Sequence, residues 1–289
     1  MSQAIKAQNE KEGFVRAIKC FQFLGKAELK VLMKLWKFDS GTAIHSLNVA
    51  LRLREMLDQI HFLPGRKTFT WNELIKKSGF SEEQLLRAAL LHDIGKMRIP
   101  KAILFKGGRF TDDERAIVQT HEKHSKSMLS ELGYLLEAEI VGQHHNYEKQ
   151  PVMCCFYFPI TGQWLGVANL LHIADTQSAL MQKRSYKQGY SPMETLALIS
   201  QNAIKGCACP LITAFHVRKE LKKANASYGQ RLESSSWKEI MNLSAINELL
   251  SAGRKLMKTV VSPIEVTNNV DLIALQYMTE KQLFSVATA

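Results

Sequence analysis

The chain consists of successive stretches of helical periodicity separated by short polar segments. Over residues 13–37, and again over 40–60, apolar side chains recur every three to four positions, which is the spacing of a helix with one buried face. The same pattern predicts helices over residues 81–92, 111–132, 134–146, 165–182, 192–204 and 210–224. Only residues 152–158 have the composition of a strand. The sequence therefore predicts an all-α fold.

Two of the predicted helices begin with a capping box. Ser81 is followed three positions later by Gln84, and Thr111 is followed by Glu114. In this arrangement the hydroxyl accepts a hydrogen bond from the first helical turn, and the later side chain accepts one from the backbone N–H of the capping residue. These signatures indicate where two helices in the middle of the chain start.

The composition is that of an ordinary folded protein. Of 289 residues, 46% are hydrophobic and 22% are charged. A formal net charge of +11 favours anionic partners such as phosphates and nucleotides, although a solvated basic surface would have the same composition. No run of about 18 uncharged apolar residues occurs, and the first residues lack an apolar signal segment. We therefore expect a cytoplasmic protein without a membrane span.

The candidate chemistry lies in an ordered series of histidines and aspartates. Imidazole and carboxylate groups are ligands for metals such as Fe, Mn and Zn. A carboxylate has two oxygens, so an aspartate beside a histidine at a helix end can reach two ions. A single histidine on an apolar helix is more often a core residue, so the whole series is stronger evidence for a metal site than any one member. Its members are His45, His92, Asp93, His121, His144, His145 and Asp175.

The residues around His92 and Asp93 strengthen the metal-site interpretation. Two leucines precede the pair and place it at the end of a buried helix. Gly95 would allow a tight exit from that helix. Lys96 adds a positive charge where a phosphate oxygen would lie beside the metals. The segment therefore favours phosphate chemistry.

The segment LLHDIGKMRIPKAILFKGGRFTDDE, with THEKHSKSML after it, resembles the HD-GYP subgroup of HD-domain phosphohydrolases. The family pattern continues with a His-His pair, an Ala-Asp helix and an Arg-x-Tyr-Arg segment, for which this chain has RSYK at residues 184–187. The resemblance covers about residues 40–216 and implies an HD-domain helical bundle with extra terminal helices. We expect an N-terminal helical extension over 1–38, the HD-GYP-like domain over 39–224 and a C-terminal helical extension over 225–289.

The resemblance also implies a binuclear metal centre. One ion would be held by His45, His92, Asp93 and Asp175, and Asp93 would bridge to a second ion held by His121, His144 and His145. The ions would be Fe or Mn, with Zn, Mg or Ni as alternatives. Asp93 and Lys96 would act in catalysis, and Lys96 would contact the scissile phosphate. The remaining substrate contacts would come from Arg184, Tyr186 and Lys187.

Three departures from the family pattern bear on the substrate and the metals. The Gly-Tyr-Pro signature is absent after the His-His pair, where residues 146–151 read NYEKQP. Gly41 stands where some members have a glutamate that binds a third metal, so we expect no third ion. Ser178 stands where the family usually has a second aspartate. The ligand series itself is complete.

These observations predict a metal-dependent phosphodiesterase that hydrolyses a cyclic dinucleotide of the cyclic di-GMP type. Because the Gly-Tyr-Pro segment is missing, an HD-type nucleotide phosphohydrolase with a different substrate stays open. A non-catalytic, nucleotide-binding signalling module is a third interpretation. Nucleic-acid binding is less favoured than these three interpretations, because no recognition motif supports it. A homodimer or a signalling partner protein is compatible with the amphipathic helices outside the resemblance.

Overall fold

The structure, a computed structural model, describes most of the chain up to residue 205. The described residues are 3–59, 61–62, 69–70, 80–145, 155–158, 163–182 and 188–205, with isolated positions at 213–214, 216–217, 220 and 248. Helices dominate these ranges, so the predicted all-α class is confirmed. The predicted helix over 210–224 is described only at scattered helical positions, and the expected C-terminal extension over 225–289 lies outside the described residues except at one position.

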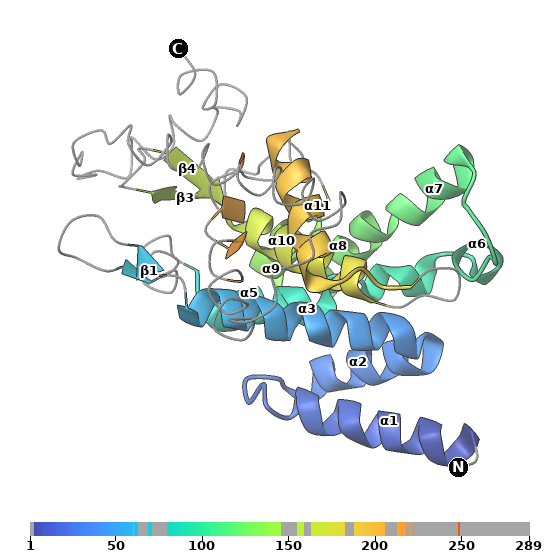
Figure 1. Ribbon diagram of the computed structural model, residues 1–289. Coiled ribbons are helices and arrows are strands. Elements are labelled where there is room, and N and C mark those ends of the chain that lie inside the picture. Colours follow the sequence, from blue (N-terminus) through green and yellow to red (C-terminus); the bar gives the residue numbers. More distant parts are fainter. Residues whose placement is uncertain are drawn as a thin grey trace.

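The N-terminal part forms three helices, α1 (Gln3–Ile18), α2 (Lys26–Phe38) and α3 (Ser40–Gln59). Figure 1 shows α1 and α2 in succession beneath α3, and both helices contact α3. Phe14 of α1 and Leu35 of α2 are buried in the same hydrophobic cluster as the central helices. The described residues 3–38 therefore cover the core, and the domain boundaries expected from the sequence remain a prediction.

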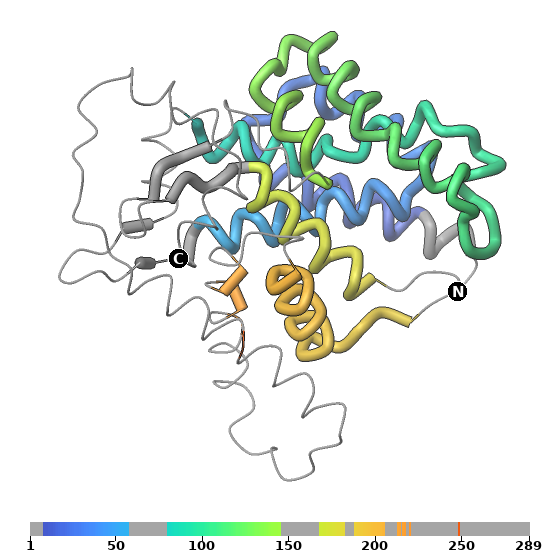
Figure 2. Tube along the Cα trace, turned by 90° about the horizontal axis from the view of Figure 1, so that it is seen from above, coloured from blue at the N-terminus to red at the C-terminus, as the bar shows by residue number. Residues whose placement is uncertain are grey.

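The central bundle packs α3 against α5 (Glu82–Leu91) and α10 (Val167–Met181). Six consecutive or near-consecutive side chains of α5 are buried because neighbouring helices cover it on several sides. The tube in Figure 2 shows α10 crossing the bundle beside α11 (Pro192–Ile204), which packs against it. The core therefore surrounds the end of α5, where the His-Asp pair lies.

The outer part of the bundle consists of short helices that follow one another in the sequence. They are η1 (Ile94–Arg98), α6 (Lys101–Leu104), α7 (Asp112–Gln119), α8 (His121–Glu131) and α9 (Leu135–Val141). Both predicted capping boxes are present, at the starts of α5 and α7. In Figure 1, α6 and α7 stand at the edge of the bundle.

The prediction of one helix over residues 111–132 was wrong, because the helix breaks at Thr120 between α7 and α8. The backbone N–H and the hydroxyl of Thr120 both donate to the carbonyl oxygen of Ile117, which tightens the last turn of α7. The helix predicted over 134–146 also ends earlier, at Val141. These two endings place histidines at helix termini, where neighbouring side chains can face one point.

Two short antiparallel strand pairs accompany the helices. They join β1 (His61–Phe62) to β2 (Phe69–Thr70), and β3 (Cys155–Phe158) to β4 (Gln163–Gly166). The described part of the predicted strand over 152–158 is therefore a strand, and residues 152–154 lie outside the described ranges. None of the helices in those ranges is long and apolar enough to cross a lipid bilayer.

Candidate metal centre

All seven predicted ligands meet in the middle of the bundle. They come from elements far apart in the sequence, and six of the seven side chains are buried. The exception is His145, whose side chain is 40% exposed. The ligands are His45 on α3, His92 at the end of α5, Asp93 before η1, His121 at the start of α8, His144 and His145 after α9, and Asp175 on α10.

The first cluster joins α3, α5 and α10. Nε2 of His45 lies 2.7 Å from Oδ1 of Asp175, and Nε2 of His92 lies 3.7 Å from the same oxygen. One ligand atom from each of these three residues lies within 4.8 Å of the other two. Ser178, which replaces the expected second aspartate, lies with its Oγ 3.3 Å from Nδ1 of His45. The serine therefore supports the orientation of the first histidine.

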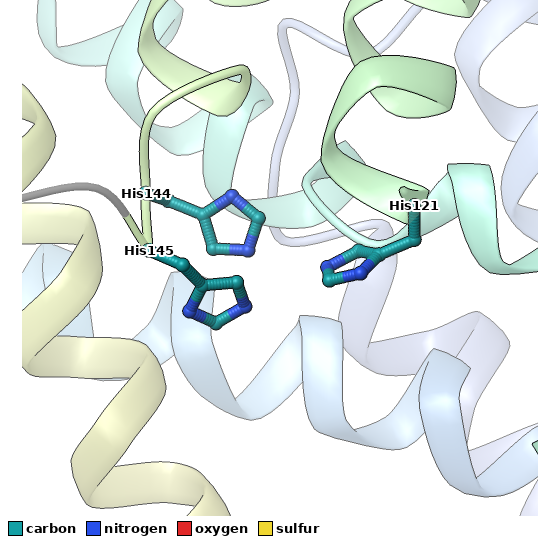
Figure 3. A group of neighbouring side chains, drawn as sticks. All are labelled: His121, His144 and His145. Carbon is teal, nitrogen blue, oxygen red and sulfur yellow. The ribbon is translucent and has the colours of Figure 1, made fainter. Parts of the chain in front are cut away.

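The second cluster contains His121, His144 and His145, which also offer ligand atoms within 4.8 Å of one another. Figure 3 shows the three rings turned toward a common point, with His121 approaching from the opposite side. The ring centroids of His144 and His145 are 4.0 Å apart. Three imidazoles around one point are a suitable donor set for a divalent transition metal.

Asp93 lies between the two clusters. Its Oδ1 is 3.3 Å from Nε2 of His121, and its Oδ2 is 3.3 Å from Nε2 of His92. The two oxygens therefore face histidines of different clusters. This is the arrangement that a carboxylate bridging two ions requires.

The anchoring of three ligand histidines determines which nitrogen faces the site. Nδ1 of His92, His121 and His144 lies 2.7–2.8 Å from the carbonyl oxygen three residues earlier in each case. Nδ1–H donates to that oxygen, so Nε2 carries the lone pair in the neutral ring. All three Nε2 atoms are buried without a hydrogen-bond partner among the described residues. Buried polar nitrogens without a hydrogen-bond partner are costly, and a metal ion bound to all three Nε2 atoms would satisfy them.

Burial and nearby charges shift the pKa values of these histidines in different directions. Burial lowers the pKa of His121 from its ordinary 6.5 to about 4, despite the opposing charge of Asp93. Burial also holds the pKa of His144 well below its ordinary value. At His92 burial again acts to lower the pKa, but the carboxylates of Asp93 and Asp175 outweigh it and raise the pKa to about 10. His121 and His144 are thus neutral at pH 7, and the space between the carboxylates favours a cation.

The two aspartates are ionised at neutral pH. Burial acts to raise the pKa of Asp93, but the charges of Lys96 and His92 outweigh it and hold the pKa well below its ordinary value. At Asp175 burial is likewise outweighed, by the hydrogen bond from His45 and the nearby ring of His92, and its pKa is also well below the ordinary value. Both carboxylates are therefore available as anionic ligands.

Gly95 allows η1 to approach α8 closely. A Cβ atom on this glycine would overlap the backbone of His121 and Ser125. The Gly95 N–H instead donates to Oγ of Ser125 at 2.8 Å. The sequence predicted that Gly95 would allow a tight helix exit, but Gly133 is the only glycine with positive φ in the described residues. Gly95 is needed for close packing, which brings Asp93 to His121.

Sequence reasoning missed Glu122, which follows His121. Its Oε1 accepts a hydrogen bond from the backbone N–H of His145 at 2.8 Å and lies 3.8 Å from Nδ1 of His144. The glutamate therefore ties α8 to the turn that holds two ligands. No local signal marks this role, because the two segments meet only in the folded chain.

The predicted substrate contacts divide into two groups. Lys96 lines a cavity of about 620 Å³ together with ligands of both clusters. Its side chain is 23% exposed, and its Nζ lies 2.6 Å from Oδ2 of Asp93. Arg184, Tyr186 and Lys187 lie outside the described residues. Of the four residues predicted to bind substrate, the structure thus places one, beside the candidate metal centre.

Known proteins resemble this chain over the region that contains the site. A cyclic di-GMP phosphodiesterase of Pseudomonas aeruginosa is 26% identical over 170 residues, which are 59% of this chain and 37% of that protein. A 3′3′-cGAMP-specific phosphodiesterase of Vibrio cholerae is 32% identical over 122 residues, 41% of this chain and 25% of the relative. The chain thus spans about a third or less of the length of these relatives.

A solved structure and a family pattern extend the comparison. The HD domain of the Listeria monocytogenes phosphodiesterase PgpH, in complex with cyclic di-AMP, has a TM-score of 0.44 and 17% identity, covering 71% of this chain and 100% of that chain. The HD domain pattern matches residues 42–187, about half of the chain and the part that holds all seven clustered ligands. This chain therefore belongs to the HD domain family.

Proposed function

We propose that this chain hydrolyses a phosphodiester bond of a cyclic dinucleotide, using two divalent metal ions. The observation that carries the proposal is the set of three buried, unpartnered Nε2 atoms converging beside two ionised aspartates. A cluster of this kind is costly to bury without a cation. Its donor types suit Fe or Mn, with Zn, Mg or Ni as alternatives.

The two clusters would divide the ligands between the ions. His45, His92 and Asp175 would hold one ion, and His121, His144 and His145 the other. Asp93, which faces both clusters, would bridge them. Metal ions bound here would lower the pKa of a water molecule and polarise the phosphoryl oxygens.

The protein groups around the ions would position the phosphate. Lys96 lines the cavity beside Asp93, where its ammonium group would contact a non-bridging oxygen of the scissile phosphate. That contact would stabilise the negative charge that develops as the bond breaks. Arg184, Tyr186 and Lys187 remain predicted contacts for the rest of the substrate.

The relatives support a cyclic dinucleotide as the substrate class. The two curated relatives described above are named for cyclic di-GMP and 3′3′-cGAMP, and the net charge of +11 suits a substrate with two phosphates. The missing Gly-Tyr-Pro segment favours a second candidate, a nucleotide phosphohydrolase with a different substrate. Activity assays can separate the two.

The test is a substrate screen with purified protein loaded with Mn or Fe. Cyclic di-GMP, 3′3′-cGAMP and cyclic di-AMP are compared with nucleoside mono- and triphosphates and with bis(p-nitrophenyl) phosphate. We expect turnover of at least one cyclic dinucleotide, and its loss with a chelator. The Asp93→Ala variant should lose both bound metal and turnover. Full activity in that variant would refute the proposed centre, and binding without turnover in the loaded protein would favour a signalling module.

A further inference from the structure

A second cavity opens beside the metal centre, and we call it the basic groove. It has a volume of about 710 Å³ and lies between the start of α3, η1 and the segment from α6 to α7. Lys96, Phe110 and Arg115 line both this groove and the cavity of the metal centre. A ligand at the metals can therefore extend into the groove.

The groove contains two arginines whose charge is not neutralised. Lys106 pairs with Glu114 at 2.7 Å, and Lys96 pairs with Asp93. Arg109 and Arg115 are exposed and have no acidic or hydrogen-bonding partner within the described ranges. Guanidinium groups in this state are suited to bind a phosphate through paired hydrogen bonds.

Asp39, the acidic residue that lines the groove, forms no ion pair with these arginines in the described part of the chain. The carboxylate of Asp39 accepts hydrogen bonds from the backbone N–H groups of Gly41 and Thr42, at 3.0 and 3.2 Å. It also accepts one from the Thr42 hydroxyl at 2.5 Å. Asp39 therefore caps the start of α3, and the groove is lined by one acidic and four basic side chains.

An exposed aromatic ring lies in the same groove. Phe105 lines it and is 50% exposed, although large apolar side chains are usually buried. One part of its ring packs against Phe38, with ring centroids 5.7 Å apart. A partly exposed ring beside unpaired arginines is the combination that binds a nucleobase and its phosphate.

We propose that the basic groove is a second subsite, which holds the nucleotide half of the substrate that lies farther from the metals. Arg109 and Arg115 bind its phosphate, and Phe105 stacks on its base. The inference rests on the proposed function, since a cyclic dinucleotide with one phosphate at the metals has a second nucleotide that needs its own site. A second subsite of this kind would make a dinucleotide, rather than a mononucleotide, the substrate class of the metal centre.

Binding to metal-free protein tests the subsite without requiring turnover. Chelator-treated protein is titrated with cyclic di-GMP, 3′3′-cGAMP and cyclic di-AMP, and with guanosine monophosphate for comparison. We expect a cyclic dinucleotide to bind at least about tenfold more tightly than the mononucleotide. Arg109→Gln and Arg115→Gln should each weaken that binding by about tenfold, the loss of one charge-assisted contact. Phe105→Ala should weaken it too, and Phe105→Tyr should restore it.

Arg98→Gln is the matched control, because Arg98 is an exposed arginine that pairs with Glu131 and lines neither cavity. It should bind the dinucleotide like the wild type. Equal affinities for dinucleotide and mononucleotide, or wild-type binding by both groove arginine variants, would overturn the subsite. Failure of the loaded wild type to hydrolyse any of the three cyclic dinucleotides would instead refute the phosphodiesterase proposal and leave the binding result standing.

Discussion

The ammonium group of Lys96 lies 2.6 Å from Oδ2 of Asp93, the carboxylate that faces both histidine clusters. This contact places a fixed positive charge at the mouth of the candidate metal centre. It is also the main attraction that holds the pKa of Asp93 well below its ordinary value, against the effect of burial. Lys96 therefore affects both the bridging ligand and the phosphate that would bind beside it.

Replacing this lysine should separate catalysis from metal binding. We expect Lys96→Met to keep its bound metal, because Lys96 is not a ligand, but to lower kcat by about a hundredfold through the loss of charge stabilisation. Metal content by elemental analysis and steady-state kinetics check the two parts. Lys126→Met is the control, since Lys126 pairs with Glu139 and lines neither cavity. A loss of metal equal to the loss of activity would contradict a purely catalytic role.

The packing of η1 on α8 gives a second prediction. A methyl group at Gly95 would meet backbone atoms of His121 and Ser125 that cannot move independently. Gly95→Ala should therefore lower the free energy of unfolding by about 1–3 kcal/mol and weaken metal binding by separating Asp93 from His121. Denaturant unfolding of the metal-free protein and metal titration measure these effects.

Gly13→Ala is the matched control for this packing argument. Gly13 is exposed within α1, and a Cβ atom there would meet nothing within 4 Å. Alanine should raise the free energy of unfolding by about 0.5–1 kcal/mol, because glycine is the poorer helix former. If both variants shifted stability in the same direction, the close approach at Gly95 would not be the cause.

The ligand series could be predicted from the sequence because its two adjacent pairs are marked locally and the resemblance to HD-domain phosphohydrolases implies the other members. His92 and Asp93 follow a buried helix, and His144 and His145 are adjacent in the chain, so their spacing indicates their joint role. The break at Thr120 was not predicted, because periodicity alone does not distinguish one helix from two in line. That break nevertheless makes His121 the first residue of α8, from which it reaches Asp93.

Residues that act across distant contacts could not be found in this way. Glu122 supports His145 only because α8 lies against the turn after α9. Arg115 reaches the metal cavity only because α7 packs against α8, whose first residue is the ligand His121. In sequence, both are charged residues on helix faces that would ordinarily be solvated. Their positions follow from tertiary packing, which hydrophobic periodicity does not encode.

Glu122 should be a positioning residue for the metal centre. Glu122→Ala removes the acceptor for the His145 N–H, so the turn that holds His144 and His145 loses one constraint. We expect metal affinity to fall by about 10–100-fold, as for other residues that orient metal ligands. Glu122→Gln keeps a carbonyl oxygen at the same place and should recover most of the affinity.

Metal titration by calorimetry distinguishes this role from a general loss of stability. Glu131→Ala, which changes an exposed glutamate on the same helix, should bind metal like the wild type. Equal losses in the alanine and glutamine variants would show that the charge of Glu122, rather than its hydrogen bond, matters.

A buried ion pair between Arg87 on α5 and two glutamates gives a prediction on pH. The guanidinium of Arg87 lies 3.3 Å from Oε1 of Glu28 and 2.7 Å from Oε1 of Glu137, and both glutamates are buried. Burial acts to raise the pKa of Glu28, but hydrogen bonds from Tyr134 and its own backbone, with the charge of Arg87, lower it below its ordinary 4.5. The ionised form of Glu28 therefore favours folding.

Because the pKa of Glu28 is lower in the folded protein, its contribution is complete above about pH 4.5 and is lost as the pH falls through the folded value. Glu28→Gln should lower the free energy of unfolding by about 1–3 kcal/mol at pH 7, and the difference from the wild type should shrink toward pH 3. Denaturant unfolding of chelator-treated protein across this range measures the difference. Glu10→Gln, an exposed substitution in α1, should follow the wild-type curve. A constant difference for Glu28→Gln at all pH values would show that its carboxylate charge does not stabilise the fold.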